Sequence, residues 1–361
     1  MKKVLIICPH RTNRSPGQRF RYEQYLSFLE QNGYQFDISI LLNEKDDKAL
    51  YSNSFVGKVF IYFKTLAIRT KDWFRANRYD IIFIFREALL TGSIFFEKRF
   101  ANSKAKLIYD FDDAIWLQNV SDANKKLAFL KNPSKTGAII KRSDLIFAGN
   151  QYLADYAAQF NKNIAIVPTT IDTSIYVNQK KERDDNVICI GWSGSFTTIQ
   201  HFSTAIPALK KIREKYGDKV RFKIIGDPTY YCQELDTKGV PWKAATEIED
   251  LSEIDIGIMP LPDDEWAKGK CGLKGLQYMA LGIPTLMSPV GVNTEIIQHG
   301  VNGYLPVTDN EWVTNISQLI DNKELRKKIG DAGRQTVVDK YSVEAWKQQY
   351  LNNFNQLLQK S

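Results

Sequence analysis

The sequence predicts an α/β protein made of two Rossmann-like, doubly wound domains. Three observations support this prediction. The chain has 361 residues, which is too many for one ordinary core and suits two domains. Short apolar runs alternate with stretches long enough to form helices. A purely polar segment, residues 178–186, interrupts that alternation near the middle of the chain.

The first half carries short apolar runs that read as strands. They are nearly continuous in hydrophobicity, as in strands that are buried on both faces of a parallel sheet. The stretches between most of them can hold a crossover helix. The runs are Val4–Cys8, Phe36–Leu42, Tyr79–Phe85, Lys106–Phe111, Leu145–Ala148 and Ile164–Val167.

The pattern restarts after the polar segment. Predicted strands are Val187–Trp192, Arg221–Gly226, Ile254–Leu261 and Pro284–Ser288, with helices such as Thr197–Tyr216 and Gly272–Leu281 between them. Ser342 can cap a last helix that has Glu344 in its first turn. We therefore expect a first domain over 1–172, a linker over 173–186, a second domain over 187–341 and a final helix over 342–361.

The positive charge is confined to the first half. Up to Asp172 there are 26 Lys and Arg against 17 Asp and Glu, and after it 23 against 24. This asymmetry predicts an anionic partner for the first domain: nucleic acid, anionic lipid or a phosphorylated acceptor.

Residues 55–78 concentrate that charge and predict an amphipathic helix. Lys64, Lys71, Arg75 and Arg78 fall on one side at 100° per residue. Two interpretations are open: the opposite, aromatic side packs on the core, or the helix lies on an anionic membrane surface. The residues of that opposite side are Phe55, Val59, Tyr62, Leu66 and Trp73.

Cysteine and histidine usage argues against disulfides and metal sites. The four cysteines form no Cys-x-x-Cys pair, which favours reduced thiols and a cytoplasmic location. The three histidines occur singly, so we expect no metal. These residues are Cys8, Cys189, Cys232 and Cys271, and His10, His201 and His299. No run approaches the roughly 20 apolar residues of a transmembrane helix.

Two glycine turns follow strands of the second half. Ser193, Gly194 and Ser195 precede a helix, where backbone N–H groups suit a diphosphate. Tight packing is the alternative function of such a turn. Gly226 ends the next strand, and it either approaches a nucleoside or only turns the chain.

Three elements further along the chain form a recognisable set: Lys270-Cys-Gly-Leu-Lys274, Gln277-Tyr-Met-Ala-Leu-Gly282 and Ser288-Pro-Val-Gly-Val-Asn293. Together they resemble the donor-binding half of the retaining glycosyltransferases of family four, which have the GT-B fold. The resemblance is strongest over 186–305 and looser over 1–172. It implies two Rossmann-like domains that face a cleft, with a C-terminal helix that returns to the first domain.

The resemblance implies that this loop and helix start hold a nucleoside-diphosphate sugar. The implied residues are Lys270, Cys271, Gly272, Leu273 and Lys274. Lys274 is expected to stabilise charge on the leaving phosphate, and a solvated helix lysine is the alternative. Lys270 is a weaker candidate for the same role.

The acids of the family pattern are missing. Relatives carry two glutamates separated by seven residues, and the corresponding positions are Gly269 and Gln277. Gln277 can still bind ribose hydroxyls. The first acid has no equivalent, although Asp263, Asp264 or Glu265 can supply one. Trp242 lies where relatives position the nucleobase, with burial in the core as the alternative.

In the first domain, Gly17 and Arg19 match the glycine loop of the family. Asp110, Asp112 and Asp113 follow a strand, so they are expected to hydrogen-bond sugar or acceptor hydroxyls. An Asp-x-Asp pair can also hold a metal, but the lysines and amides can neutralise phosphate without one.

The implied reaction is a retaining sugar transfer from a nucleoside-diphosphate sugar, used as co-substrate without a cofactor or metal. The acceptor is expected to be a lipid-linked or other saccharide in bacterial polysaccharide assembly, at the inner face of the cell membrane. Alternatives are a degenerate GT-B binding or scaffold subunit, or a sugar-nucleotide epimerase or hydrolase. A nucleic-acid partner explains the charge but not the motif, so none is expected.

Overall fold

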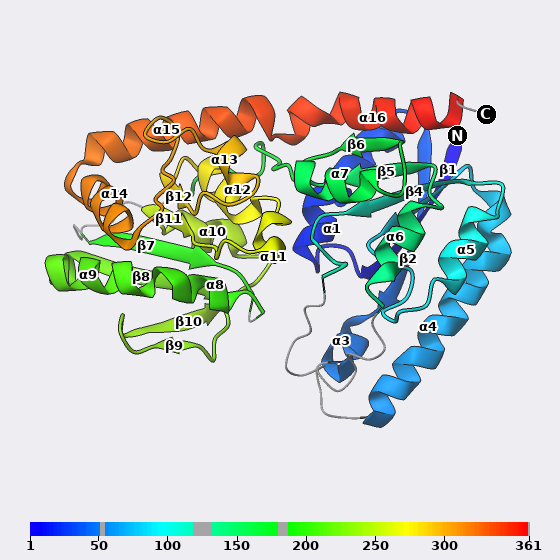
Figure 1. Cartoon of the computed structure of the whole chain (residues 1–361), viewed down its shortest axis with the longest axis horizontal. Coiled ribbons are helices and arrows are strands. Elements are labelled where there is room, and N and C mark those ends of the chain that lie inside the picture. Colours follow the sequence, from blue (N-terminus) through cyan, green and yellow to red (C-terminus); the bar gives the residue numbers. More distant parts are fainter. Residues whose placement is uncertain (51–54, 118–131, 180–186, 196, 360–361) are drawn as a thin grey trace. The chain divides into compact units, whose positions relative to one another are not determined.

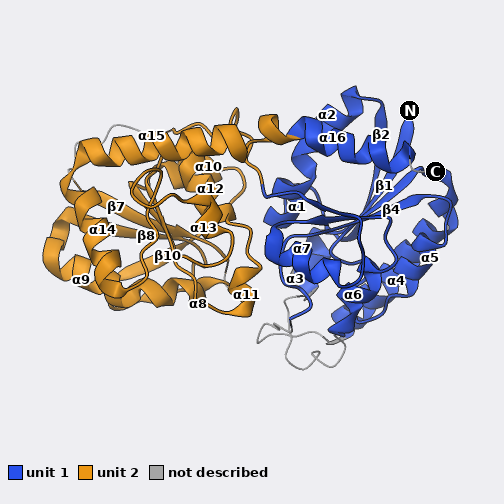
Figure 2. Cartoon of the chain, turned by 45° about the horizontal axis from the view of Figure 1, so that its top comes forward, with its two compact units in different colours: residues 1–169, 347–361 blue, residues 170–346 orange. Residues whose placement is uncertain are grey.

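The computed structural model describes the whole chain except residues 51–54, 118–131, 180–186, 196 and 360–361. It divides into two compact units, shown in Figure 2. The first unit comprises residues 1–169 and 347–361, and the second comprises 170–346. Each unit is built around its own sheet, which confirms the predicted α/β class.

The first unit contains a six-stranded parallel sheet with the order β2-β1-β3-β4-β5-β6. Each apolar run of the first half forms one of its strands. The strands are β1 (Lys2–His10), β2 (Tyr34–Leu42), β3 (Ile81–Phe85), β4 (Lys106–Phe111), β5 (Leu145–Ala148) and β6 (Ile164–Ile166). All residues of β3 and β5 are buried, as expected for central strands that helices cover on both faces.

Helices connect these strands along the chain (Figure 1). They are α1 (Pro16–Arg21), α2 (Leu26–Gln31), α3 (Glu44–Leu50), α4 (Phe55–Arg75), α5 (Phe95–Ala101), α6 (Ser134–Ile140) and α7 (Gln151–Ala158). The last helix, α16 (Val343–Gln359), returns to this unit as predicted. Its Tyr350 and Phe354 pack on Phe147, with ring centroids 5.3 and 6.2 Å away.

The second unit contains a sheet with the order β12-β11-β7-β8-β10-β9. Its strands are β7 (Ile188–Ser193), β8 (Val220–Gly226), β9 (Tyr231–Cys232), β10 (Thr237–Pro241), β11 (Ile256–Met259) and β12 (Thr285–Met287). Only the β9–β10 pair is antiparallel, and the sequence did not predict these two strands.

The helices of the second unit are α8 (Ile199–Phe202), α9 (Ile206–Tyr216), α10 (Glu247–Ser252), α11 (Glu265–Lys268), α12 (Leu273–Ala280), α13 (Asn293–Ile296), α14 (Asp309–Asp321) and α15 (Lys323–Lys340). The single helix predicted over 197–216 is wrong: a 3-10 turn at 203–205 divides it. Pro207 lies in the first turn of α9, where its missing N–H costs nothing, so the second part starts as a new helix.

Residues on both sides of the expected end of the first domain, at 172, group with the second unit. Ile171 N–H donates to Tyr341 O at 2.8 Å, and Val343 N–H donates to Ile171 O at 3.1 Å. Arg334 donates to the carbonyl of Tyr176 at 2.9 Å. These bonds hold residues 171–176 on the second unit. Of the rest of the predicted linker, residues 180–186 lie outside the described residues.

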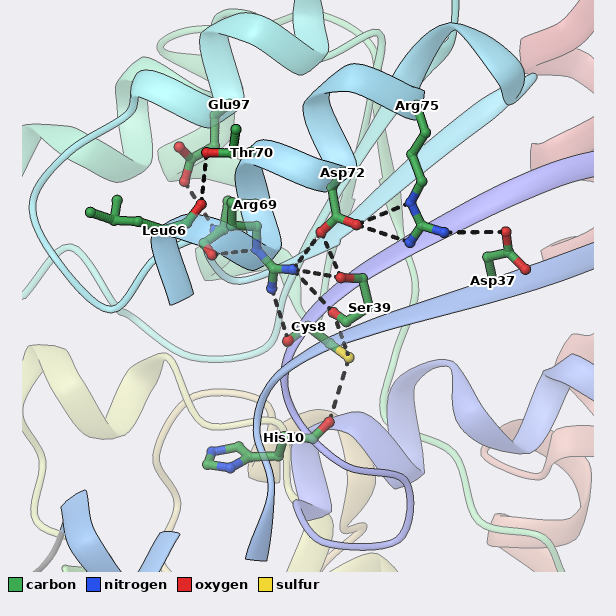
Figure 3. Close-up of polar contacts among 11 residues, drawn as sticks. Cys8, His10, Asp37, Ser39, Leu66, Arg69, Thr70, Asp72, Arg75 and Glu97 are labelled. Carbon is green, nitrogen blue, oxygen red and sulfur yellow. Dashed lines mark hydrogen bonds and ion pairs between the residues drawn. The ribbon is translucent and has the colours of Figure 1, made fainter. Parts of the chain in front are cut away.

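Of the two interpretations left open for residues 55–78, packing of the aromatic side of α4 on the core does not fit the structure. The buried side of α4 is largely polar, with Thr65, Arg69 and Asp72 at 5%, 0% and 1% exposure. Figure 3 shows how Arg69 joins Asp72 and Ser39: its Nη1 donates to Ser39 Oγ and to Asp72 Oδ2, each at 2.8 Å. Of the aromatic side, Val59 and Tyr62 are exposed, and the Phe55 side chain lies outside the described residues. An ion-paired face can be buried where hydropathy alone predicts a solvated one.

The basic residues predicted for one side of α4 differ in their environments. Arg75 donates to Asp72 Oδ1 at 2.9 Å and also faces Asp37. Lys64 is paired with Asp46 of α3. Lys71 remains exposed. Among the described residues, no helix is both long and apolar enough to cross a bilayer.

Candidate functional site

The carboxyl ends of β7 and β8 form one side of the candidate site in the second unit. Gly226 has φ +142°, and a Cβ there would lie 2.2 Å from the carbonyl oxygen of Gly194. The N–H of Gly194 donates to Ile225 O at 2.9 Å. The two predicted glycines therefore pack directly on each other, which is a sufficient reason for both to be glycine.

The loop after β7 uses its own backbone donors. Ser193 N–H donates to the Tyr278 hydroxyl at 2.7 Å, and Ser195 N–H donates to Thr198 Oγ1 at 3.0 Å. Ser195 Oγ lies 2.9 Å from Thr197 Oγ1. The N–H groups that the sequence offered to a diphosphate are thus engaged within the unit. An anion at this loop would meet the exposed hydroxyls of Ser195 and Thr197 instead.

The start of α12 forms the other side. Gly272 has φ +71°, and a Cβ there would lie 2.4 Å from Ile296 Cδ1, so the left-handed turn and the close packing both require glycine. The turn ends the short loop that carries Lys270 and places Lys274 in the first turn of the helix. Lys274 Nζ lies 5.1 Å from the centroid of the buried Trp192 ring. Positive charge is therefore collected at a helix N-terminus, which is itself an anion-binding feature.

His201 lies in the same electrostatic environment, and the sequence did not single it out. Burial, and then the charges of Lys274 and Lys270, lower the pKa of His201 to about 4, whereas Asp264 acts in the opposite direction. The imidazole is 4% exposed. Within the described residues its Nδ1 has no hydrogen-bond partner, and neither has Trp192 Nε1. His201 Nδ1 and Trp192 Nε1 are therefore two buried polar atoms that a bound ligand could satisfy.

The Ser288–Asn293 turn of the sequence motif packs beside the loop that carries the lysines. Asn293 donates from Nδ2 to Ser288 O at 2.9 Å, and Ser288 Oγ accepts from Leu261 N–H at the same distance. A Cβ at Gly291 would lie 2.7 Å from Lys268 O, so this turn packs closely on the lysine loop. Cys271 is buried beside this loop, and Leu273 begins α12. These residues form the frame that holds the two lysines.

Gln277 and the half-buried Trp242, predicted for ribose and nucleobase, both contact the buried Glu247. Gln277 donates from Nε2 to the Tyr176 hydroxyl at 3.0 Å and to Glu247 Oε1 at 3.2 Å. The Trp242 indole donates to the same carboxyl oxygen at 2.8 Å. Tyr176 donates to the other oxygen, Oε2, at 2.6 Å. Glu247 thus places a carboxylate beside Gln277, the position at which the family resemblance implies a glutamate.

Sequence reasoning missed Glu247 because nothing links it to Gln277 along the chain. It reads there as an ordinary acidic residue at the start of a helix. Of the three acids that were left open, Asp264 caps α11 by accepting from Ala267 N–H at 2.7 Å, and its charge acts on His201. Glu265 pairs with Lys268 at 2.7 Å, and Asp263 is exposed.

In the first unit, Asp110 is fully buried and does not present its carboxylate at an accessible edge. It is ion-paired with Arg21, whose Nε lies 3.2 Å from Asp110 Oδ1. Burial raises the pKa of Asp110, and Arg21 opposes this shift. Arg21 also donates to the carbonyl of Val167. The predicted contact of Asp110 with a sugar or acceptor hydroxyl does not fit this environment.

Asp112 is instead brought next to Gly17. Arg86 contacts Asp112 Oδ1 through Nε and Nη2 at 2.8 and 2.7 Å. A Cβ at Gly17 would lie 2.9 Å from Asp112 Oδ2. Burial alone would lower the pKa of Arg86, but Asp112 and Asp113 outweigh it and raise that pKa. Sequence reasoning missed Arg86. In the structure its φ of +62° marks an unusual position for a non-glycine residue, which no sequence pattern revealed.

The remaining residues predicted in the first unit have simpler environments. Asp113 accepts from Ala114 N–H at 3.1 Å. The Arg19 guanidinium lies 4.9 Å from the Phe20 ring centroid. The two carboxylates of the Asp-x-Asp pair, Asp110 and Asp112, are each paired with a different arginine.

Comparison with known proteins adds independent information. Residues 187–322 match the sequence model of the family described as "Glycosyl transferases group 1". Over 233 residues the chain is 27% identical to the N-acetyl-alpha-D-glucosaminyl L-malate synthase of Bacillus anthracis. That match covers 58% of this chain and 59% of the synthase, so it spans less than two thirds of that relative.

Solved structures resemble the chain over its whole length. Sucrose-phosphate synthase from Thermosynechococcus elongatus has a TM-score of 0.73 at 14% identity and covers 100% of both chains. Anabaena HepE, solved with UDP and glucose, has a TM-score of 0.65 at 15% identity over 99% of this chain and 100% of its own. At such identities the likeness concerns the fold. The chain therefore has the GT-B fold, and its residues 187–322 are similar to the group 1 glycosyltransferases.

Proposed function

We propose that the chain is a glycosyltransferase that uses a nucleoside-diphosphate sugar. The observation that carries the proposal is the convergence of Lys270, Lys274 and the buried His201 at the start of α12, inside the segment that matches the family. Loss of a nucleoside diphosphate from a sugar develops negative charge on the phosphate. Fixed positive charge stabilises that transition state more than the ground state.

Lys274 is the residue proposed to contact the leaving phosphate. With its pKa near 4, His201 is neutral at pH 7 and can still donate one hydrogen bond to a phosphate oxygen. Trp192 offers a second unused N–H beside Lys274. This set would supply the charge and the donors that a diphosphate requires, without a cofactor or metal.

The retaining outcome follows from the family resemblance and is part of the proposal. In a front-face reaction the acceptor hydroxyl attacks from the side of the leaving phosphate, and that phosphate takes the hydroxyl proton. The protein then mainly positions the two substrates and stabilises charge. Glu247 and Gln277 would hold the ribose edge. The amide nitrogen of Gln277 already donates to Tyr176 and Glu247, so its Oε1 would accept a hydrogen bond from a ribose hydroxyl.

Relatives guide the choice of substrates to test. HepE was solved with UDP and glucose, so a UDP-sugar is the first donor to examine. The acceptor is proposed to be a lipid-linked glycan, with an anionic membrane surface as the partner of the basic first unit. A location at the inner face of the cell membrane would bring the first unit to its lipid-linked acceptor.

Donor binding can be tested by a thermal-shift and calorimetric panel of UDP-, GDP- and CMP-sugars. We expect one of them to bind, and Lys274→Ala to weaken binding by about 1.5–3 kcal/mol, or roughly tenfold or more. Lys210→Ala, which removes an exposed lysine of α9, is the matched control and should bind normally. If no nucleotide sugar binds, the proposal fails. Donor binding without turnover on any glycan acceptor would instead indicate the degenerate binding subunit.

A further inference from the structure

We infer that α4 docks the first unit on an anionic phospholipid bilayer through an apolar stripe that faces solvent. The stripe consists of Val56, Val59, Phe60, Phe63 and Phe74. This inference rests on the membrane partner proposed above, but it replaces the basic side of the helix with a different face. It does not depend on the identity of the sugar donor.

The stripe follows one side of the helix, with four members in its first half and Phe74 near its end. At 100° per residue its five members fall within about 100° of one another, and from Val56 to Phe74 they extend over about 27 Å. Val56, Phe60, Phe63 and Phe74 are 78%, 68%, 63% and 77% exposed. Single exposed apolar residues are ordinary on a protein surface, but such an aligned set marks an interaction site.

The ion-paired inner side of α4 sets the orientation of the helix and keeps the stripe on the solvent side. Arg69 donates from Nε to Ala88 O at 2.7 Å and from Nη2 to Cys8 O at 3.2 Å, in addition to its bonds to Asp72 and Ser39. Figure 3 shows these contacts reaching β1 and β2. Rotation of the helix to bury its phenylalanines would leave Arg69 and Asp72 without these partners, at a large cost. The exposure is therefore built into the fold.

The charges around the stripe suit an anionic surface. Helix α5 packs beside α4, with Trp73 and Phe95 ring centroids 6.0 Å apart (Figure 1). Both acids of the two helices, Asp72 and Glu97, are 1% exposed. The exposed charges of α4 and α5 are basic and include Lys71, Lys98 and Arg99. The Arg99 guanidinium stacks 4.8 Å from the Trp73 ring centroid.

A bilayer is the occupant that this combination favours. Aromatic side chains on one face of an amphipathic helix enter the boundary between headgroups and acyl chains, and adjacent lysines and arginines attract anionic headgroups. The helix is not apolar enough to span the membrane. An interfacial position, parallel to the surface, uses both features at once.

The experiment measures sedimentation of the full chain with vesicles of phosphatidylcholine alone or with phosphatidylglycerol. We expect the wild type to bind the anionic vesicles and F60S/F63S to bind them on the order of tenfold more weakly. V301S/V307S, which changes two exposed valines of the second unit, is the matched control and should bind as the wild type does. Both changed residues of F60S/F63S are exposed, so its thermal unfolding and its nucleotide-sugar binding should stay normal.

Each outcome separates the hypotheses. If the wild type does not bind anionic vesicles, the proposed membrane partner and the docking stripe are both wrong, and the proposal of donor binding is unaffected. If F60S/F63S binds vesicles as the wild type does, only the stripe is overturned. If the substitution instead changes the oligomeric state measured by light scattering and leaves vesicle binding unaltered, the stripe is a protein interface and the inference is wrong.

Discussion

Burial and the charges of two lysines lower the pKa of His201. Burial lowers its pKa first, and Lys274 then lowers it further. We therefore predict that Lys274→Gln raises the pKa of His201 from about 4 towards its ordinary value of 6.5 without reaching it, because burial remains. Titration of the three histidine rings by NMR measures this directly. An unchanged His201 titration would separate the two residues and remove the basis for a common phosphate site.

The same group makes the stability of the protein pH-dependent. A histidine whose pKa is lower folded than unfolded binds fewer protons in the native state between pH 6.5 and about 4. Its contribution is therefore retained above pH 6.5 and lost as the pH falls through that window. After allowance for screening, we expect a loss on the order of 1–2 kcal/mol that Lys274→Gln reduces. Urea unfolding at several pH values would show it.

At Gln277 we predict that restoring the glutamate of the family pattern destabilises this protein. The Gln277 amide nitrogen donates to Glu247 Oε1 at 3.2 Å, so Gln277→Glu would place two carboxylates in contact in a buried cluster. The expected cost is about 2 kcal/mol or more. Exchanging the pair, as Q277E/E247Q, restores one acid and one amide and should recover most of the loss. Urea denaturation of the full double-mutant cycle measures the coupling.

Additive losses in that cycle would mean that the two side chains do not interact, and the proposed ribose edge would lose its carboxylate. The contact between Gln277 and Glu247 also gives a structural reason for the departure from the family pattern. Glu247, from α10, already supplies an acid at this place, and glutamine at 277 is the partner that satisfies it. Sequence motifs record which residue occupies a position, but a carboxylate can reach the same place from another element.

Among the elements, the strands were predicted well from the sequence, except for β9 and β10. Runs such as Ile81–Phe85 and Leu145–Ala148 are apolar throughout, so their burial in a parallel sheet leaves few alternatives. The motif of the second unit was recognised through its family resemblance, and the structure gives a physical reason for its glycines. Gly272 must adopt a left-handed conformation, and Gly291 must pass close to Lys268 O.

Helix orientation and tertiary polar pairs could not be predicted in the same way. The hydropathy of α4 favours an aromatic inner face, but Arg69 and Asp72 satisfy each other and are buried instead. The pairs Arg86–Asp112 and Gln277–Glu247 join residues 26 and 30 positions apart. No local pattern records such a pairing. For the same reason Asp110 looked accessible at the end of its strand, although Arg21 pairs with it in the interior.

At the scale of the whole molecule, α16 belongs to both units: residues up to Trp346 group with the second unit and those from Lys347 with the first. Phe354 is 2% exposed and packs on Phe83 and Phe147. We predict that Phe354→Ala destabilises the first unit by about 3–5 kcal/mol, because it leaves a cavity in that core. Gln348→Ala, at an exposed position of the same helix, is the control.

Hydrogen exchange followed by mass spectrometry distinguishes the response of each unit. Since β3 and β5 lie in the sheet that Phe354 covers, their amides should exchange faster in the variant, in line with the lower stability of the first unit. Strands β7 and β11 have a separate core and should keep their protection, as should nucleotide-sugar binding by the second unit. Equal acceleration in both sheets would mean that the two units unfold as one cooperative body, so that a loss of packing in the first unit lowers the stability of the second as well.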